Sequence, residues 1–315
     1  MARPARRVHP KRWILICIVL LLVLMMAWPV YLLFYGNSLL IHTDALSGRP
    51  DTPGTTYLIV GSDKRPAGSH DPAVGERSDS IMLLQVPESG SPALVSLPRD
   101  SWVTIPGHGH NKLNAAFALG GAPLLVTTVE NLTGMTIDHY VQVSMLSLKS
   151  LVDAVGGVNL CLNMNVKDAD SGLVWKSGCH DADGTQALAF SRMRKSDPTG
   201  DIGRTNRQRQ VVSKVVSSAA NPAVLMNPFK QRALVSAAAT NLTTDTSTGM
   251  VDLGKAALSL KKTMGDGGLV GVPPIATING RRGGLSVVVL ADSAPQFFQK
   301  MKDGELSAAD FGRIG

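Results

Sequence analysis

The longest run of apolar positions begins at Trp13 and ends at Phe34, and its 22 residues carry no charge. As a helix this run would be about 33 Å long, which is enough to cross the hydrocarbon core of a membrane. We therefore expect a transmembrane helix over 13–34. The alternative is a cleaved signal peptide, but its apolar region would be shorter and no small-x-small cleavage site follows here.

Residues 35–56 contain Gly, Ser, Pro and Asp without apolar periodicity and are predicted to be a stalk. From residue 57 onward short apolar runs alternate with helical patterns, which predicts one α/β domain over 57–315, built on a mixed sheet with helices on both sides. Strands are expected at 56–61, 81–86, 93–97, 138–145, 158–162 and 284–292, helices at 122–132, 146–155, 203–220, 230–239, 250–262 and 294–301, and a loop at 240–248.

The positive charge of the chain is concentrated at its N-terminus. The whole chain has 31 Lys and Arg against 24 Asp and Glu. Five of the basic residues lie within 1–12, so the remainder has 26 basic and 24 acidic residues and gives no reason to expect a nucleic-acid partner. A basic flank before an apolar span keeps that side in the cytoplasm. We therefore expect a cytoplasmic tail over 1–12 and an extracytoplasmic domain after a single membrane pass.

Two of the three cysteines fall in the part of the chain that is expected to be exported. Cys17 lies inside the apolar span, whereas Cys161 and Cys179 follow it. Such a pair tends to oxidise outside the cytoplasm, which favours a disulfide, and two unpaired buried thiols are the alternative.

Arginine and aspartate gather where predicted strands end. Asp63 follows the first strand, Arg77 and Asp79 precede the second, and Arg99 follows the third. Open α/β sheets usually bind ligands at such an edge. Carboxylates are hard oxygen donors that suit Mg²⁺, and guanidinium groups bind phosphate oxygens in pairs. The pattern therefore indicates a site for phosphate and metal. His108 and His110 form the one close histidine pair, which indicates a metal site or a plain polar loop.

Further arginines follow in two groups. Arg192 and Arg194 are two residues apart, so in an extended segment both would point to the same side. Arg204, Arg207 and Gln208 are at i, i+3 and i+4, which in a helix puts them on one face, whereas Arg209 turns aside. A solvated charged face is the alternative interpretation of this second run.

These residues lie in segments that closely resemble the LytR-CpsA-Psr family of cell-wall polymer ligases. The resemblance covers Tyr57 to about Val212 and becomes loose after about Asn221. Its pieces, in the family's order, include YLIVGSDKR, ERSDSIMLL, VSLPRDSWVTIPG, NKLNAAFALGG, GTQALAFSRMR and DIGRTNRQRQVV.

The resemblance implies an α/β/α sandwich whose apolar pocket holds a polyprenyl chain, with the pyrophosphate at the mouth. It implies Asp63 and Asp79 as ligands of Mg²⁺ or Mn²⁺, and these two with Arg77 and Arg99 as the catalytic residues. Asp100 and Lys112 lie in matching motifs and are either catalytic or structural. The cysteine pair resembles an arrangement in actinobacterial members. The implied phosphate ligands are Arg77, Arg99, Arg192, Arg194, Arg204, Arg207 and Gln208.

The function that the resemblance implies is a phosphotransferase in the cell membrane. It would move a glycan phosphate from a polyprenyl-pyrophosphate carrier to a hydroxyl of peptidoglycan, with an actinobacterial arabinogalactan-type polymer as the leading candidate. The alternatives are a polyprenyl-pyrophosphate hydrolase, which uses water as acceptor, and a non-enzymatic regulator or lipid-binding protein of the cell envelope.

Overall fold

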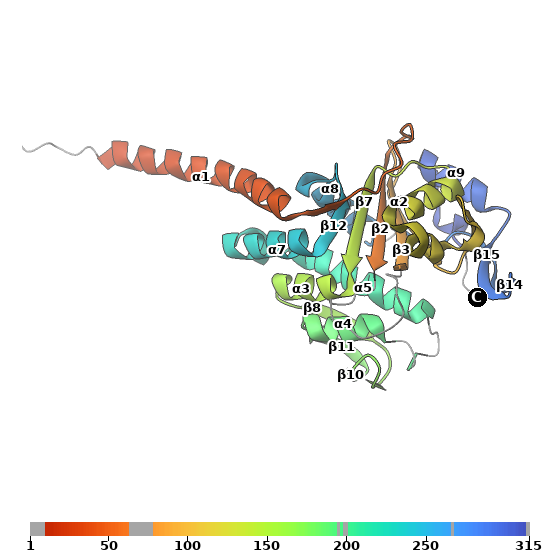
Figure 1. Ribbon diagram of the computed structural model, residues 1–315. Helices are drawn as coiled ribbons and strands as arrows, with labels where there is room; N and C mark the ends of the chain where they lie inside the picture. The colour runs from red at the N-terminus through yellow and green to blue at the C-terminus, as the bar shows by residue number, and fades with distance from the viewer. Residues whose placement is uncertain (1–9, 63–77, 194–195, 198–200, 266–267, 313–315) are drawn as a thin grey trace, which may run out of the picture.

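The structure is a computed structural model that describes residues 10–62, 78–193, 196–197, 201–265 and 268–312. A long helix, α1 (Pro10–Leu39), projects from the rest of the protein (Figure 1). Its segment Trp13–Asn37 is long and apolar enough to span a membrane and has its apolar side chains exposed. This helix contains the predicted span 13–34. Leu113–Thr133 is also long and apolar enough to span a membrane, but it is less apolar and is half buried as a core helix.

The centre of the domain is a seven-stranded sheet in the order β1-β12-β7-β2-β3-β4-β13. The pairs β1–β12, β2–β7 and β4–β13 are parallel, and the other neighbours are antiparallel, so the mixed sheet that the sequence predicts is confirmed. The strands are β1 (Ile41–Thr43), β2 (Thr55–Ser62), β3 (Ser78–Val86), β4 (Ala93–Leu97), β7 (His139–Ser144), β12 (Leu242–Asp245) and β13 (Leu269–Gly271).

Helices cover both faces of this sheet because the central strands carry apolar residues on both of their faces. Alternate residues of a strand point to opposite faces, so Leu58 and Ile59 of β2 belong to different cores. Leu58 packs in the core of α2 (Leu113–Thr133) and α9 (Ala294–Asp303). Ile59 packs in the core of α8 (Met250–Thr263). The helix α5 (Asp201–Ala219) lies on the α8 side.

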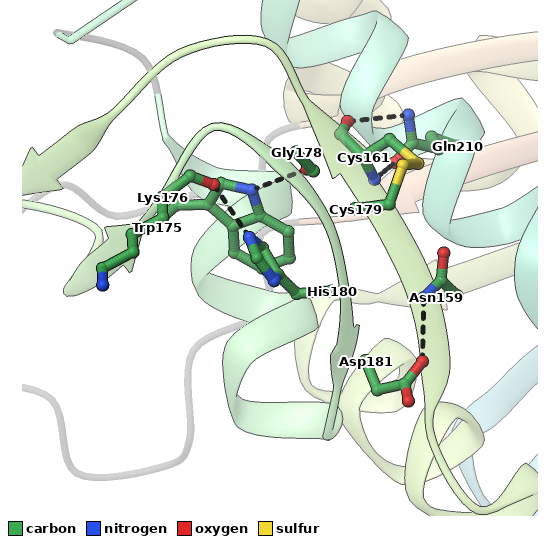
Figure 2. Close-up of a disulfide and its surroundings, with 9 residues drawn as sticks. All are labelled: Asn159, Cys161, Trp175, Lys176, Gly178, Cys179, His180, Asp181 and Gln210. Atoms are coloured by element: carbon green, nitrogen blue, oxygen red, sulfur yellow. Dashed lines mark hydrogen bonds between the residues drawn. A yellow bond between two sulfur atoms is a disulfide. The ribbon is translucent and has the colours of Figure 1, made fainter.

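A smaller core lies beside the sheet and joins α5 to the segment 145–193. It contains α3 (Met145–Val155), β8 (Val158–Leu162), β9 (Val166–Asp168), β10 (Leu173–Trp175), β11 (Gly178–Ala182) and α4 (Gly184–Arg192). Strands β8 and β11 form a separate antiparallel pair in which Cys161 lies directly opposite Cys179. Their side chains form a disulfide, which confirms the predicted bond (Figure 2).

Two predicted loops are part of the sheet. The segment 35–56 is not a free stalk, because α1 continues to Leu39, β1 pairs with β12, and the buried Glu130 of α2 accepts a hydrogen bond from Ser47 and an ion pair from Arg49. The predicted loop 240–248 contains β12, which bridges β1 and β7. Both strands are short and polar, so their pairing depends on partners distant in the chain.

The remaining elements lie around this framework. The predicted last strand is β15 (Leu285–Leu290), which pairs with β14 (Ile275–Arg282), has a single bridge from Val288 to Ser101 and stays outside the central sheet. A second hairpin consists of β5 (Trp102–Ile105) and β6 (Gly109–Lys112). Helices α6 (Pro222–Leu225) and α7 (Pro228–Asn241) follow α5, and a short 3-10 turn, η1 (Ala308–Asp310), follows α9.

Candidate functional site

An apolar cavity of about 360 Å³ lies between the sheet and the helices α3, α5, α7 and α8. A volume of this size is typical of a ligand pocket. Its wall is formed by aliphatic side chains, by methionines and by glycines, and the polar residues among the described ones that line it are Ser80, Ser144 and Gln208. The cavity therefore suits a hydrocarbon ligand and carries almost no hydrogen-bonding capacity along its length.

The polar residues of the cavity mark one end of the central strands. Ser80 of β3 pairs with Gly61 of β2, and one step further Ser78 pairs with Ser62 across a bulge. Asp63 follows Ser62 in the chain, but it lies outside the described residues, as does Arg77. Asp79 belongs to β3, and its side chain is not described.

The register of the β2–β3 pair places Ser62 opposite Ser78, the residue before Asp79. The Ser62 hydroxyl is buried and has no hydrogen-bond partner among the described residues. In the described part of the chain no group of three or more His, Cys, Asp or Glu could hold a metal, His108 and His110 included. His110 instead stacks on Trp102 within the β5–β6 hairpin.

Helix α5 brings Gln208 to the cavity and Arg204 one turn before it, as the i, i+4 spacing predicts. Arg207, on the same helix, is buried, and protein atoms engage its guanidinium group on several sides. Its Nε donates to the Phe190 carbonyl at 3.1 Å, and its Nη atoms contact the Met193 carbonyl and the Asp197 carboxylate. The guanidinium group of Arg207 thus connects α5 to the end of α4.

Arg192 is the last residue of α4 and its side chain is exposed. It makes no hydrogen bond or ion pair with any residue that the structure describes. The expected extended segment does not include Arg192, because the helix continues through this residue and the extended backbone begins at Met193. Arg194, the expected second member of this pair, lies outside the described residues.

The loop after β4 holds Arg99 next to a second cation. Asp100 accepts an ion pair from Arg99 Nε at 3.6 Å and from Lys112 Nζ at 2.8 Å. The Arg99 carbonyl accepts a hydrogen bond from Asn114 N, and the Asp100 carbonyl accepts one from Val288 N. The backbone of this loop is therefore fastened to α2 and β15, and Asp100 orients both neighbouring cations.

Arg209, which helical spacing turns away from the face of Arg204, Arg207 and Gln208, contacts the central sheet. Its guanidinium donates to the Ser96 hydroxyl of β4 at 3.1 and 2.7 Å and to the Gly271 carbonyl of β13 at 3.5 Å. Burial lowers the pKa of Arg209. The sequence does contain a signal for this burial, because Arg209 is at i, i+3, i+7 spacing with Val212 and Val216 and therefore shares their face of the helix. Both valines line the cavity.

Fold and site together define a class of protein, namely an α/β/α domain on an apolar N-terminal helix, with an apolar cavity that Gln208 lines one turn after Arg204 of α5. The chain belongs to the LytR_cpsA_psr family, whose profile matches residues 41–268. This finding supports the family that the sequence motifs indicate, and the matched region begins within the segment that was predicted to be a stalk.

Two relatives and two solved structures show the range of similarity. A probable cell wall biosynthesis protein LcpB from Corynebacterium glutamicum is 40% identical over 221 residues, which are 67% of this chain and 53% of that protein. A polyisoprenyl-teichoic acid–peptidoglycan teichoic acid transferase TagU from Enterococcus faecalis is 40% identical over 191 residues, 60% of this chain and 61% of that protein. The chain thus spans about half the length of the curated relatives it matches.

A LytR-Csp2A-Psr enzyme from Actinomyces oris superposes with a TM-score of 0.65 at 22% identity, covering 84% of this chain and 96% of that one. TagT bound to LIIa-WTA superposes with a TM-score of 0.60 at 22% identity, covering 84% and 99%. At these identities the structures support the fold.

Proposed function

We propose that this protein transfers a glycan phosphate from a polyprenyl-pyrophosphate carrier to a hydroxyl group of peptidoglycan. The observation that carries the proposal is the apolar cavity that ends at Gln208, with Arg204 on the same face of α5. Such a site matches an amphiphile with a long hydrocarbon chain and an anionic head. The names of the relatives, a teichoic acid transferase and a cell wall biosynthesis protein, support a glycopolymer as the transferred group.

In this reaction the oxygen of the acceptor hydroxyl attacks the phosphorus atom on the glycan side of the pyrophosphate. A new P–O bond forms to the acceptor, and the bond from that phosphorus to the bridging oxygen breaks. Polyprenyl phosphate leaves with the bridging oxygen, and the hydroxyl proton is lost to a base. Positioning and charge stabilisation can supply the catalysis of such a transfer without a covalent intermediate.

The arginines have different roles in this proposal, and each role follows from the surroundings of the side chain. Arg99, Arg192 and Arg204 offer guanidinium groups to the phosphate oxygens, and the family resemblance adds Arg77 and Arg194. Arg207 acts as a positioning residue, since its contacts hold the end of α4, and with it Arg192, against α5. Asp63 and Asp79 would hold Mg²⁺ or Mn²⁺, which would supply positive charge to the leaving phosphate.

The test uses the full chain with a lipid-linked glycan pyrophosphate and a muropeptide acceptor. We expect a covalent glycan-phosphate adduct of the muropeptide by mass spectrometry, lost when divalent metal is chelated and restored by added Mg²⁺. Release of free glycan phosphate in the presence of acceptor would identify a hydrolase instead. Binding of the lipid without any turnover would identify a lipid-binding envelope protein and would overturn the proposal.

A further inference from the structure

The end of α1 packs against the helices that form the cavity wall. Trp28 Nε1 donates to the side chain of Gln231 on α7 at 2.5 Å. About two turns later along α1, the Tyr35 ring lies 5.0 Å beneath the guanidinium of Arg232. Asn37 then accepts a hydrogen bond from Met250 N at the start of α8, at 2.8 Å. Helices α1 and α7 therefore lie side by side and run in the same direction (Figure 1).

The contact is close enough to require a small residue on α1. A Cβ atom added at Gly36 would lie 2.9 Å from Cγ1 of Val235 and 2.6 Å from Cγ of Met250. Both of these side chains also line the apolar cavity. The membrane helix and the cavity thus share one wall, and the cavity is fixed in position relative to the span.

This packing sets the depth of the beginning of α7. Trp28 is six residues before Phe34, where the apolar run ends, so along a helix it lies about 9 Å inside that end. Gln231 is at the level of Trp28. Because α7 begins at Pro228 and runs parallel to α1, the turn between α6 and α7 lies at that level or deeper.

The turn at this depth is a corner of large exposed apolar side chains. Leu225, Met226 and Phe229 are 55%, 85% and 84% exposed. We call these three residues the α6–α7 corner. An exposed cluster of this kind on a protein surface usually marks an interaction site.

The backbone of the corner is held in shape by caps. Asn227 Oδ1 accepts from Phe229 N and Lys230 N, and prolines begin both helices. Lys230 is exposed next to the corner and can extend toward lipid headgroups.

We propose that the α6–α7 corner is inserted into the leaflet on the domain side of the membrane, beside α1. The partner is the bilayer itself, because the same span that fixes the depth of the corner is surrounded by lipid. Amphipathic elements of this type bury their apolar side by about 5–10 Å, which matches the depth set by Trp28. The corner holds the cavity wall of α7 against the bilayer, so that a hydrocarbon chain passes from membrane to cavity without crossing water. This last consequence rests on the proposed function, whereas the insertion does not.

The insertion is tested with the full chain in vesicles of phosphatidylcholine and phosphatidylglycerol. In a Cys17→Ala background, Met226→Cys is labelled with an environment-sensitive fluorophore while the Cys161–Cys179 disulfide stays intact. The matched control is Val174→Cys, which is 75% exposed on β10, away from α1 in Figure 1. We expect the label at 226 to emit at shorter wavelength and to be quenched by doxyl groups on lipid acyl chains but not by aqueous iodide, and the label at 174 to behave in the opposite way.

Equal iodide quenching at both positions would overturn the proposal. Protection of position 226 from both quenchers would also overturn it, because a protein surface would then cover the corner. For the consequence, the double variant M226D/F229D should lose turnover severalfold with substrate embedded in the bilayer and keep it with substrate dispersed in detergent, and V174D should keep both. If the parent protein turns over neither substrate, the proposed function fails, while the quenching result still decides the insertion.

Discussion

At the scale of single residues, the arginines of the site differ in what holds them. Arg207 is buried among the Phe190 carbonyl, the Met193 carbonyl and Asp197, whereas Arg192 is exposed at the end of α4. Helical spacing predicted that Arg207 shares a face with Arg204 and Gln208. Arg207 is buried because α4 packs against α5. The spacing of residues within α5 alone does not predict that contact.

This difference predicts opposite effects of two alanine variants. Arg192→Ala should lower turnover about a hundredfold, or about 3 kcal/mol in the barrier, with an unchanged unfolding midpoint, because one guanidinium is lost at a transferring phosphate. Arg207→Ala should lower the free energy of unfolding by about 3–5 kcal/mol, because the buried ion pair between Arg207 and Asp197 is broken. Initial rates and chemical denaturation of both variants measure the two effects.

Lysine at position 192 is the control, since a point charge should restore only part of the rate. Turnover of Arg192→Ala at the parent rate would show that this arginine belongs to a solvated surface.

At the scale of elements, the β8–β11 pair is the best-fastened part of the small core. Besides the disulfide, Gln210 of α5 bonds both the N–H and the carbonyl of Cys161, and Asn159 donates to Asp181 across the strands (Figure 2). Trp175 donates to the Gly178 carbonyl and packs on Phe190. The sequence predicted β8 and the bond, but not the partner strand, whose pattern is polar.

We expect the disulfide to stabilise the domain by about 3 kcal/mol, as the chain-entropy model predicts for a loop of this size. The double variant C161S/C179S should show this loss in urea denaturation, and reduction of the parent protein should reproduce it. Alkylation of the unreduced, denatured protein should modify Cys17 alone. Modification of Cys161 and Cys179 as well would contradict the bond.

The C-terminal elements offer a test by pH. The Lys300 ammonium of α9 lies 2.6 Å from Asp310, and with Ser307 it lowers the pKa of Asp310 to about 2 from the ordinary 3.8. Because the folded-state pKa is lowered, this pair stabilises the fold fully above about pH 4 and loses its contribution as the pH falls toward 2.

Asp310→Asn should therefore cost up to about 1 kcal/mol near neutral pH, since the pair is partly exposed and screened. The difference from the parent protein should vanish near pH 2. Urea denaturation at the two pH values checks this, and a difference that is independent of pH would exclude the ion pair as its cause.

At the scale of the whole molecule, the basic flank before α1 predicts that the domain faces away from the cytoplasm. A reporter enzyme that is active only outside the cytoplasm should therefore be active when it is fused after Gly315. A cytoplasm-only reporter fused at the same place is the control and should be silent. Activity of that control would reverse the topology and remove access to peptidoglycan.

The sequence by itself determined the elements whose pattern is local. Composition and periodicity predict the apolar span, β4 with its five buried residues, and the buried faces of α5 and α9. A strand buried on both faces is a continuous apolar run, and a helix buried along one face has apolar residues every three or four positions.

The tertiary structure decided what depends on distant partners. The pairing of Ile41 with Thr243, the bonds of Arg209 to Ser96, and the contact of Trp28 with Gln231 each join segments more than a hundred residues apart. Periodicity within one segment can show which face is buried, but it does not show which distant segment packs on that face. Only the packing of one element on another explains why β1 forms a strand, why Arg209 contacts the sheet and why α7 lies beside the membrane helix.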